Sequence, residues 1–279
     1  MKILIIGANG QIGSSLVKTL TEHKVIPVIR DDCDLNDLGQ IKHIIDHNKS
    51  DLIINAAAYT KVDQAEDEEG IVFKINCDAP RLMAELAREQ GIPFIHFSTD
   101  YVFDGKNIKP YKEEDLTNPL GIYGASKLEA ERAIKKVGGI FFIFRTSWIY
   151  SKTGHNFYLT ILRLANEKNI LKVVNDQIGV PTSSFFIAKQ IQKIIPKLSK
   201  DNSGTYHLVP NGYCSWYSFA QAIIKKNKPE FDISKIIPVN TKNYPSKARR
   251  PLRSILDNDH FQNTFMLEFE DWKSELNKI

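Results

Sequence analysis

A glycine-rich turn near the start of the chain constrains the fold more than any other feature. The residues Gly7-Ala8-Asn9-Gly10-Gln11-Ile12-Gly13 directly follow a short apolar run, Ile3–Ile6. Gly7 permits a tight turn, Gly10 lets the backbone approach a pyrophosphate, and Gly13 lets strand and helix pack closely. A helix that starts here offers free N–H groups and a partial positive charge to phosphates. The sequence therefore predicts a strand–turn–helix unit that binds a dinucleotide through Gly7, Gly10, Gln11, Ile12 and Gly13.

Short apolar runs alternate with helical patterns through the first half of the chain. Such runs, separated by helices, are typical of a parallel sheet covered on both faces. Right-handed crossovers then give an α/β fold, a doubly wound parallel sheet of the Rossmann type. The expected strands are Ile3–Ile6, Val25–Ile29, Leu52–Asn55, Phe94–Ser98 and Ile140–Arg145. The expected helices are Ser14–Leu20, Leu38–His47, Gly70–Gln90 with a break or kink at Pro80, and Ser126–Lys136.

The second half of the chain is less regular. We expect residues 1–150 to form the nucleotide-binding domain. Residues 151–279 should form mainly a small C-terminal substrate-binding lobe, with some segments returning to the sheet. Helices are expected at Phe157–Asn166, Ser184–Leu198, Ser215–Lys226 and within Phe261–Leu276, and strands at Leu171–Asn175, Thr205–Leu208 and Ile236–Val239.

Composition and charge exclude several classes of protein. With 42% hydrophobic and 25% charged residues, the 279-residue chain has an ordinary globular composition. The net charge of +4 is mild and the basic residues are scattered, whereas nucleic-acid binding requires a basic patch. Cys33, Cys77 and Cys214 lack metal-ligand spacing and are expected to be reduced thiols. There is neither a signal-peptide pattern nor an apolar run of about 18 residues. We therefore expect a cytoplasmic protein that binds no membrane.

The end of the second expected strand bears on which dinucleotide is bound. An NAD enzyme usually has an acidic residue there to hold the ribose 2′-hydroxyl, but this chain has Arg30, followed by Asp31 and Asp32. A guanidinium can hold a 2′-phosphate and stack on adenine. The sequence therefore favours NADP(H), and Asp31 leaves NADH open as a second cofactor. The residues expected along the rest of the dinucleotide are Asp34, Leu35, Ala56, Ala57 and Ala58.

A tyrosine and a lysine lie four residues apart in the segment Tyr123-Gly124-Ala125-Ser126-Lys127. On a helix their side chains share one face. Lys127 would favour the phenolate and lower the tyrosine pKa, so that Tyr123 could give a proton to a carbonyl oxygen as hydride reaches its carbon. About one match of this spacing is expected by chance in such a chain. Its weight comes from its position after the fourth expected strand, in a chain that has the glycine turn.

The fourth expected strand ends in the hydroxyl pair Ser98-Thr99, followed by Asp100. The carboxyl ends of parallel strands face the ligand crevice. A hydroxyl there can hydrogen-bond a substrate carbonyl and polarise it. We predict this role for Thr99, with Ser98 as the alternative.

Longer stretches of the chain resemble the dTDP-4-dehydrorhamnose reductases, a family of extended short-chain dehydrogenases. The match runs in order along nearly the whole chain. The glycine turn and the Tyr/Lys pair mark the superfamily, whereas the Ser-Thr-Asp-Tyr-Val-Phe and Arg-Thr-Ser-Trp blocks are more specific. The matching stretches are 55–63, 98–103, 123–127, 144–150, 175–177, 180–182 and 248–251.

The resemblance implies NADPH-dependent reduction of the C4 ketone of dTDP-4-dehydro-β-L-rhamnose to dTDP-β-L-rhamnose. It implies that Tyr123 donates the proton and that Lys127 holds the nicotinamide ribose. It also implies that Thr99 and Asp100 bind the sugar near the reacting carbonyl and that Trp148 packs on the sugar. Phe97, with Ala56, Ala57 and Ala58, matches positions that line the cofactor.

The substrate side should carry cationic groups, because a dTDP-sugar has two phosphates. The densest arginine group of the second half is Arg249, Arg250 and Arg253, although a solvated basic loop is an equal alternative. We select Arg250 for substrate binding, and Asn156 and Gln177 as polar candidates. Trp216 and Trp272 lie in helical patterns and are expected in the core.

Magnesium is described for some members of the resembled family, bound partly through a Glu just after the glycine turn. This chain has Ser14-Ser15 at that place. The acidic run Glu66-Asp67-Glu68-Glu69 is interpreted as a solvated helix start. We therefore expect no metal site.

Two other functions stay open. One is an epimerase or dehydratase of the same fold; a dehydratase would want an Asp-Glu pair after Thr99, where this chain has Asp100-Tyr101. The other is a non-catalytic NADP-binding regulatory subunit, like the partner of methionine adenosyltransferase. The intact set of Thr99, Tyr123 and Lys127 favours an enzyme. A monomer and a homodimer are both compatible with the sequence.

Overall fold

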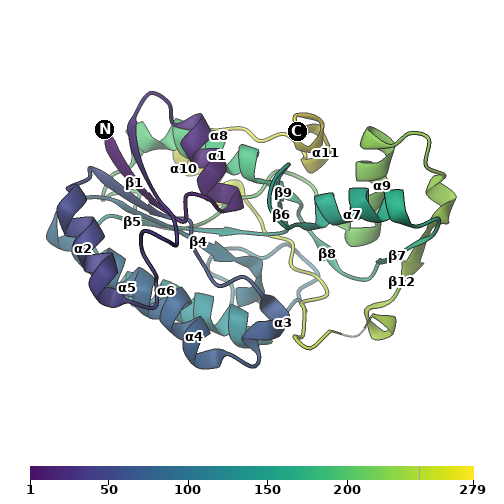
Figure 1. Cartoon of the computed structure of the whole chain (residues 1–279), viewed down its shortest axis with the longest axis horizontal. Helices are drawn as coiled ribbons and strands as arrows, with labels where there is room; N and C mark the ends of the chain where they lie inside the picture. The colour runs from purple at the N-terminus through teal and green to yellow at the C-terminus, as the bar shows by residue number, and fades with distance from the viewer. Residues whose placement is uncertain (245) are drawn as a thin grey trace.

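The computed structural model describes residues 1–244 and 246–279. At its centre is a six-stranded sheet with the order β10-β5-β4-β3-β1-β2 (Figure 1). All its pairings are parallel. The strands are β1 (Lys2–Ile6), β2 (Lys24–Val28), β3 (Leu52–Asn55), β4 (Phe94–Thr99), β5 (Phe141–Thr146) and β10 (Gly204–His207). The predicted doubly wound α/β fold is confirmed.

Helices cover both faces of the sheet because its strands are apolar on both sides. In β1, Ile3 and Ile5 point into one apolar cluster while Leu4 and Ile6 point into the other. The first cluster receives side chains from α1 (Gln11–Thr19), α8 (Ser184–Ile194) and α10 (Asp259–Phe265). The second receives them from α2 (Leu38–Asn48), α5 (Ala79–Glu89) and α6 (Ile122–Val137).

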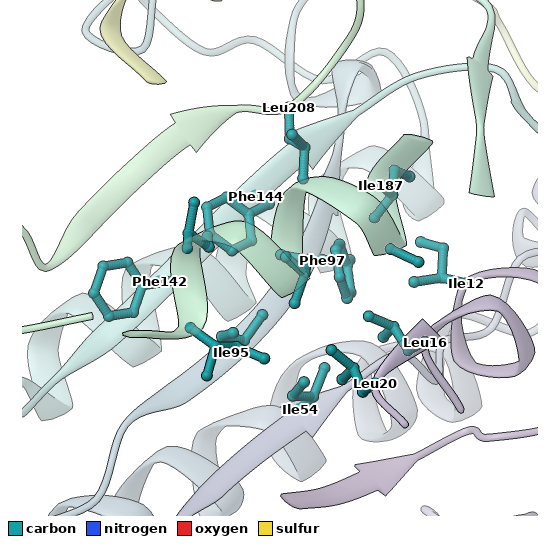
Figure 2. Packing of buried hydrophobic residues seen from close by; sticks show 14 of the residues in the cluster. Ile12, Leu16, Leu20, Ile54, Ile95, Phe97, Phe142, Phe144, Ile187 and Leu208 are labelled. Carbon is teal, nitrogen blue, oxygen red and sulfur yellow. The ribbon is translucent and has the colours of Figure 1, made fainter. Parts of the chain in front are cut away.

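The first cluster joins distant parts of the chain. Figure 2 shows Ile12, Leu16 and Leu20, from α1 and its end, close to Phe97 of β4 and Ile187 of α8. Strand β10 and helices α8 and α10 come from the second half, yet they extend and cover the sheet of the first half. The carboxyl ends of β1, β3, β4 and β5 thus meet the second half at one edge of the sheet.

The long helix expected over Gly70–Gln90 is interrupted once. Helix α4 (Glu69–Phe73), preceded by the short α3 (Val62–Ala65), runs into a π-helical turn, Lys74–Asp78, and then into α5. Pro80 lies in the first turn of α5. A proline cannot donate a backbone hydrogen bond, and its ring crowds the preceding turn. The wider π-helical turn before α5 makes room for the ring, so the helix continues through the position of the break predicted at Pro80.

The second half builds a smaller lobe. Its helices are α7 (Phe157–Glu167), α9 (Trp216–Asn227) and α11 (Trp272–Asn277). Three two-stranded ladders join β6 (Ile149–Tyr150) to β9 (Thr182–Ser183), β7 (Leu171–Val174) to β12 (Ile236–Val239), and β8 (Ile178–Gly179) to β11 (Cys214–Ser215). Short 3₁₀ turns are Asp100–Val102, Ile195–Lys197, Ile233–Lys235 and Thr241–Asn243. Trp272 is buried in this lobe, as predicted.

The three cysteines are free thiols, as expected; Cys33 and Cys214 are buried and Cys77 is half-buried. Within residues 1–244 and 246–279, none of the helices combines the length and the hydrophobicity that a membrane crossing needs.

Candidate active site

The glycine turn is shaped by contacts that only glycine allows. Gly7 has a φ of +81°, and a Cβ there would lie 2.7 Å from the backbone nitrogen of Ala57. A Cβ on Gly13 would lie 2.1 Å from the carbonyl oxygen of Gly7. Gly10 precedes α1 without a side-chain cap, and the first turn of α1 has no acidic residue. The N–H groups of that turn are therefore available to an anion such as a diphosphate.

The other residues predicted to line the cofactor fall into two groups. Arg30 is exposed just after β2 and forms no ion pair with any residue that the structure describes. Ala56, Ala57 and Ala58 are half-buried where β3 ends against the glycine turn, and Asp34 accepts hydrogen bonds from Asn36 in a tight turn. By contrast, the side chains of Ile12, Leu35 and Phe97 are each only 7% exposed and belong to the core.

The side chain of Gln11 links the glycine turn to the second half. Its Oε1 accepts hydrogen bonds from Asn156 Nδ2 at 2.9 Å and from Ser151 Oγ at 3.1 Å. Asn156 also caps α7, because its Oδ1 accepts from the N–H of Leu159. The amide group of Asn156, predicted to bind substrate, is thus engaged within the protein and joins the two halves.

Tyr123 lies in the first turn of α6 and Lys127 in the next turn, so both side chains share one face of the helix. Helix α6 begins at Ile122, four residues before the predicted start at Ser126. The prediction that Lys127 lowers the pKa of Tyr123 is wrong for this structure: burial raises that pKa to about 12, and the Thr99 hydroxyl only partly opposes the rise. The phenol therefore carries its proton at neutral pH, which is the form that a proton donor needs.

Lys127 is almost fully buried, at 2% exposure. Its Nζ lies 2.9 Å from Nε2 of His96, a residue in the middle of β4. Burial lowers the pKa of Lys127 to about 7, although Glu131 acts in the opposite direction. Sequence reasoning missed His96, although a histidine in an otherwise apolar strand was a visible signal.

The hydroxyls at the end of β4 have different partners. Ser98 donates to Glu131 Oε1, so its hydroxyl is turned into the core. Thr99 donates to Asp100 Oδ1 at 3.1 Å. Burial raises the pKa of Asp100 to about 7, against hydrogen bonds from Ser254 and Thr99. Of the two hydroxyls, it is Thr99 that faces Tyr123.

The interpretation of Glu66 to Glu69 as a solvated helix start is wrong for two residues. Oε1 of Glu66 accepts a hydrogen bond from the N–H of Ile122 at 2.9 Å and so caps α6. A carboxylate at a helix N-terminus is electrostatically favourable, and Gly121 leaves room for it, because a Cβ there would lie 2.5 Å from Glu66 Oε1. Glu68 accepts from the hydroxyl of Tyr59. The contact of Glu66 spans 56 residues of sequence and that of Glu68 spans nine, and neither follows from the helical spacing of the acidic run.

The arginine group predicted on the substrate side is divided. Arg250 forms an ion pair with Asp63 at 2.8 Å. Its charge partly opposes the rise that burial causes in the pKa of Tyr101, whose ring packs edge-on against Tyr123 at 5.8 Å. Arg253 lies elsewhere, over the ring of Tyr213. A small cleft beside Tyr123 is lined by Val62, Glu66, Tyr101, Leu120, Gly121, Gly124, Ala248, Arg249 and Pro251. Arg249 therefore lines the cleft beside Tyr123 and Arg250 lies next to Tyr101 of that cleft, whereas Arg253 lies away from it.

Trp148 has a strained backbone with a φ of +47°. For a bulky residue this conformation is costly and often marks a functional site. Its ring stacks on Trp216 at 3.6 Å, and Gly179 packs so closely that a Cβ would lie 2.6 Å from the ring. Trp216, expected in the core, is half-buried and donates to Gln177 Oε1. These contacts hold the ring of Trp148, two residues beyond the end of β5, in one orientation.

The residues after the glycine turn do not suit a divalent cation. Ser15 exchanges a hydrogen bond of 2.7 Å with Ser184. Two neutral hydroxyls bonded to each other are poor ligands for magnesium, which prefers carboxylates and water. No group of three acidic, histidine or cysteine residues suited to a metal occurs in 1–244 and 246–279.

A buried ion pair, which sequence reasoning missed, holds α6 on the sheet. Arg145 at the end of β5 donates to both carboxylate oxygens of Glu131, at 2.9 and 2.7 Å. The two side chains are only 2% and 1% exposed. Tyr123, Lys127 and Glu131 are spaced four residues apart on α6, so the pair fixes the same helix face that carries Tyr123 and Lys127.

The chain is similar over nearly its whole length to known proteins. The family model described as RmlD substrate binding domain matches residues 1–279. The dTDP-4-dehydrorhamnose reductase of Burkholderia thailandensis is 39% identical over 98% of this chain and 96% of its own length. That of Escherichia coli K12 is 38% identical over 98% and 95%. The structure of dTDP-4-dehydrorhamnose reductase from Bacillus anthracis in complex with NADP has a TM-score of 0.93, at 35% identity over 99% and 97% of the two chains. The chain therefore belongs to the RmlD family, that of the dTDP-4-dehydrorhamnose reductases.

Proposed function

We propose that this protein uses NADPH to reduce the C4 ketone of dTDP-4-dehydro-β-L-rhamnose to dTDP-β-L-rhamnose. The observation that carries the proposal is that Thr99, at the carboxyl end of β4, faces Tyr123, with Lys127 one turn further along the same face of α6. The glycine turn at the end of β1 lies on the same side of the sheet. Relatives of this chain at 39%, 38% and 35% identity are named dTDP-4-dehydrorhamnose reductase.

The chain's residues fit the dinucleotide. Gly7, Gly10 and Gly13 keep the turn free of side chains, and the uncapped start of α1 can hold a diphosphate. Exposed Arg30 suits the 2′-phosphate of NADPH, while Asp31 beside it leaves NADH as a weaker second cofactor. When bound, the nicotinamide supplies the hydride.

The protein's own part in the reaction is to hold the ketone and to give a proton. Thr99 and Tyr123 are hydroxyl donors that can meet at one carbonyl oxygen, and Tyr123 is protonated at neutral pH. Proton transfer to that oxygen balances the hydride added at carbon. Asp100, Trp148 and Arg250 hold the sugar and its diphosphate. Asn156 contributes by joining the lobe that carries the substrate, residues 151–279, to the cofactor domain, residues 1–150.

The assay that tests this function supplies purified protein with NADPH and dTDP-4-dehydro-β-L-rhamnose and follows NADPH absorbance. We expect turnover with the keto-sugar and none with NADPH alone. Chromatography of the product should give dTDP-β-L-rhamnose. An unchanged keto-sugar, or an epimerised one without loss of NADPH, would refute the proposal in favour of a binding protein or an epimerase.

The substitution Arg30→Ala tests the choice of cofactor. We expect the KM for NADPH to rise about ten- to a hundredfold, the range of one or two charge-assisted hydrogen bonds. The KM for NADH should stay nearly constant, because NADH lacks the 2′-phosphate. Initial rates at varied cofactor concentration measure both. Arg81→Ala, which removes an exposed arginine of α5, is the matched control. Equal effects on both cofactors would contradict a role for Arg30 at the 2′-phosphate.

We further propose that the enzyme is cytoplasmic and acts on a freely diffusing nucleotide sugar, as a monomer or a homodimer. Sedimentation of the purified protein distinguishes the two oligomeric states.

A further inference from the structure

Three buried polar side chains form a chain of hydrogen bonds beneath the candidate active site. Asn55 at the end of β3 contacts His96 of β4, with Nδ2 and Nδ1 at 3.1 Å. The other ring nitrogen of His96, Nε2, lies 2.9 Å from Nζ of Lys127. Asn55, His96 and Lys127 are 1%, 0% and 2% exposed. Each contact must therefore be made between a donor and an acceptor, because no solvent can replace a missing partner.

The orientation of the Asn55 amide is set by the backbone. The N–H of Ala57 can only donate, and it donates to Asn55 Oδ1 at 3.1 Å. The Nδ2 group therefore faces His96, and an amide nitrogen can only donate. His96 must then accept at Nδ1, which leaves the single proton of the neutral imidazole on Nε2.

The proton on Nε2 of His96 in turn determines the protonation state of Lys127. A protonated Nε2 donates to Lys127 Nζ, and Nζ can accept only when the amine is uncharged. We propose that Asn55 and His96 form a tautomer lock that holds Lys127 as a neutral amine in the cofactor-free enzyme. His96 is thus a positioning residue that acts through Lys127. The inference rests on the proposed role of Lys127 as the partner of Tyr123.

The surrounding charges are consistent with a neutral Lys127. Glu131, one turn further along α6, is the charged group that most favours the ammonium form of Lys127, but that carboxylate is already engaged by Arg145 and Ser98. Cys77 in the π-helical turn also faces Lys127, and burial raises the pKa of this thiol. Burial likewise lowers the pKa of His96 well below its usual value, which keeps the imidazole neutral.

The protonation state of Lys127 affects the reaction through Tyr123. The ammonium form of Lys127 stabilises the tyrosinate left behind by proton donation. The amine of Lys127 takes up a proton from solvent as the pH falls through the pKa of Lys127. The ammonium is therefore present below that pKa and lost above it. Asn55 and His96 thereby set the pH above which the phenol loses its cationic partner.

The direct test is the tautomer of His96 in the cofactor-free protein. Nitrogen-15 NMR distinguishes a protonated ring nitrogen from an unprotonated one, and the His96 signals are those missing from His96→Gln. We expect the proton on Nε2 and a lone pair on Nδ1. A proton on Nδ1 would overturn the lock. The measurement needs no variant activity, so failure of the reductase assay leaves it unaffected.

Asn55→Asp is the sharpest variant because it is isosteric. One carboxylate oxygen still accepts from Ala57, and the other can only accept from His96, which must then be protonated on Nδ1. Nε2 would offer its lone pair to the Lys127 ammonium. We expect the pKa of Lys127 to rise by about one to three units, measured on the lysine NMR signal that is missing from Lys127→Arg. An unchanged pKa would refute the proposal.

His96→Phe shows whether His96 donates to Lys127 or accepts from it, because the two cases change the pKa of Lys127 in opposite directions. If His96 donates to a neutral Lys127, its removal raises the pKa of Lys127. If His96 accepts from an ammonium, its removal lowers that pKa, and the proposal fails. The alkaline limb of kcat/KM for keto-sugar reduction should move in the same direction as the pKa in both variants. A merely structural role for His96 would change the amount of active enzyme without moving the limb.

Discussion

Tyr123→Phe is expected to lower kcat for keto-sugar reduction by about 10²- to 10⁴-fold, the usual contribution of a positioned general acid. The substitution removes one oxygen and leaves the ring, its edge-on contact with Tyr101, and the start of α6 in place. Because the phenol has a pKa of about 12 in the cofactor-free chain, it is a stable proton reservoir at neutral pH. Rapid mixing of enzyme, NADPH and keto-sugar measures the rate of the chemical step.

Binding of NADPH should be nearly unchanged in Tyr123→Phe, because the residues that suit the dinucleotide lie on the glycine turn and after β2 and β3. Fluorescence titration with NADPH tests this. The control is Tyr217→Phe, which removes a hydroxyl that accepts a hydrogen bond from Gln221 within α9; it should keep full activity. Full turnover by Tyr123→Phe would exclude Tyr123 as the proton donor and leave Asp100, with its pKa of about 7, as the acid to test next.

The parts of the fold that follow local patterns could be predicted from the sequence. The five strands of the first half were expected within about two residues of their observed bounds, because apolar runs bounded by turns constrain strands strongly. The glycine turn was predicted because its spacing encodes a specific backbone path. The start of α6 was placed four residues late. Its cap is Glu66, which is distant in sequence, so no local signal marks Ile122 as the first residue.

The site residues that sequence reasoning missed share one property. Asn55, His96, Glu131 and Arg145 are polar groups whose partners come from other strands or helices. Local periodicity assigns such positions to the core and says nothing about which polar atoms meet. For His96 and Arg145 a signal did exist, since each interrupts an apolar strand, and burying a polar group is costly unless it is paired. The partner still requires the tertiary arrangement.

The ion pair between Arg145 and Glu131 leads to the largest expected change in stability. Arg145→Met keeps the length and apolar volume of the side chain but leaves the Glu131 carboxylate buried without its cation. Breaking a buried pair in this way typically costs about 3–5 kcal/mol. Here the loss also affects the hydrogen bond from Ser98 and the contact of the guanidinium over Phe103. Urea unfolding followed by circular dichroism measures the free energy of unfolding.

A second substitution in the same protein should recover part of this loss. In the double variant Arg145→Met with Glu131→Leu, no charge is left unpaired, and buried ion pairs can be replaced by apolar side chains at little cost. We therefore expect the double variant to unfold at higher urea concentration than Arg145→Met alone. Arg132→Met provides the control on the same helix, because Arg132 pairs with Glu129 at the surface, where such pairs contribute about 0–1 kcal/mol.

The same series tests whether the pair also orients the catalytic face of α6. Tyr123 and Lys127 precede Glu131 by two turns and one turn, so a loosened Glu131 would let that face shift on the sheet. We expect the double variant to regain stability but to keep a reduced kcat, because an apolar contact does not fix the helix register as a bidentate ion pair does. If its stability and its kcat both returned to the original values, Arg145 and Glu131 would contribute to folding alone. If the loss of stability in the double variant equalled the sum of the losses in Arg145→Met and in Glu131→Leu made alone, the two side chains would not be energetically coupled.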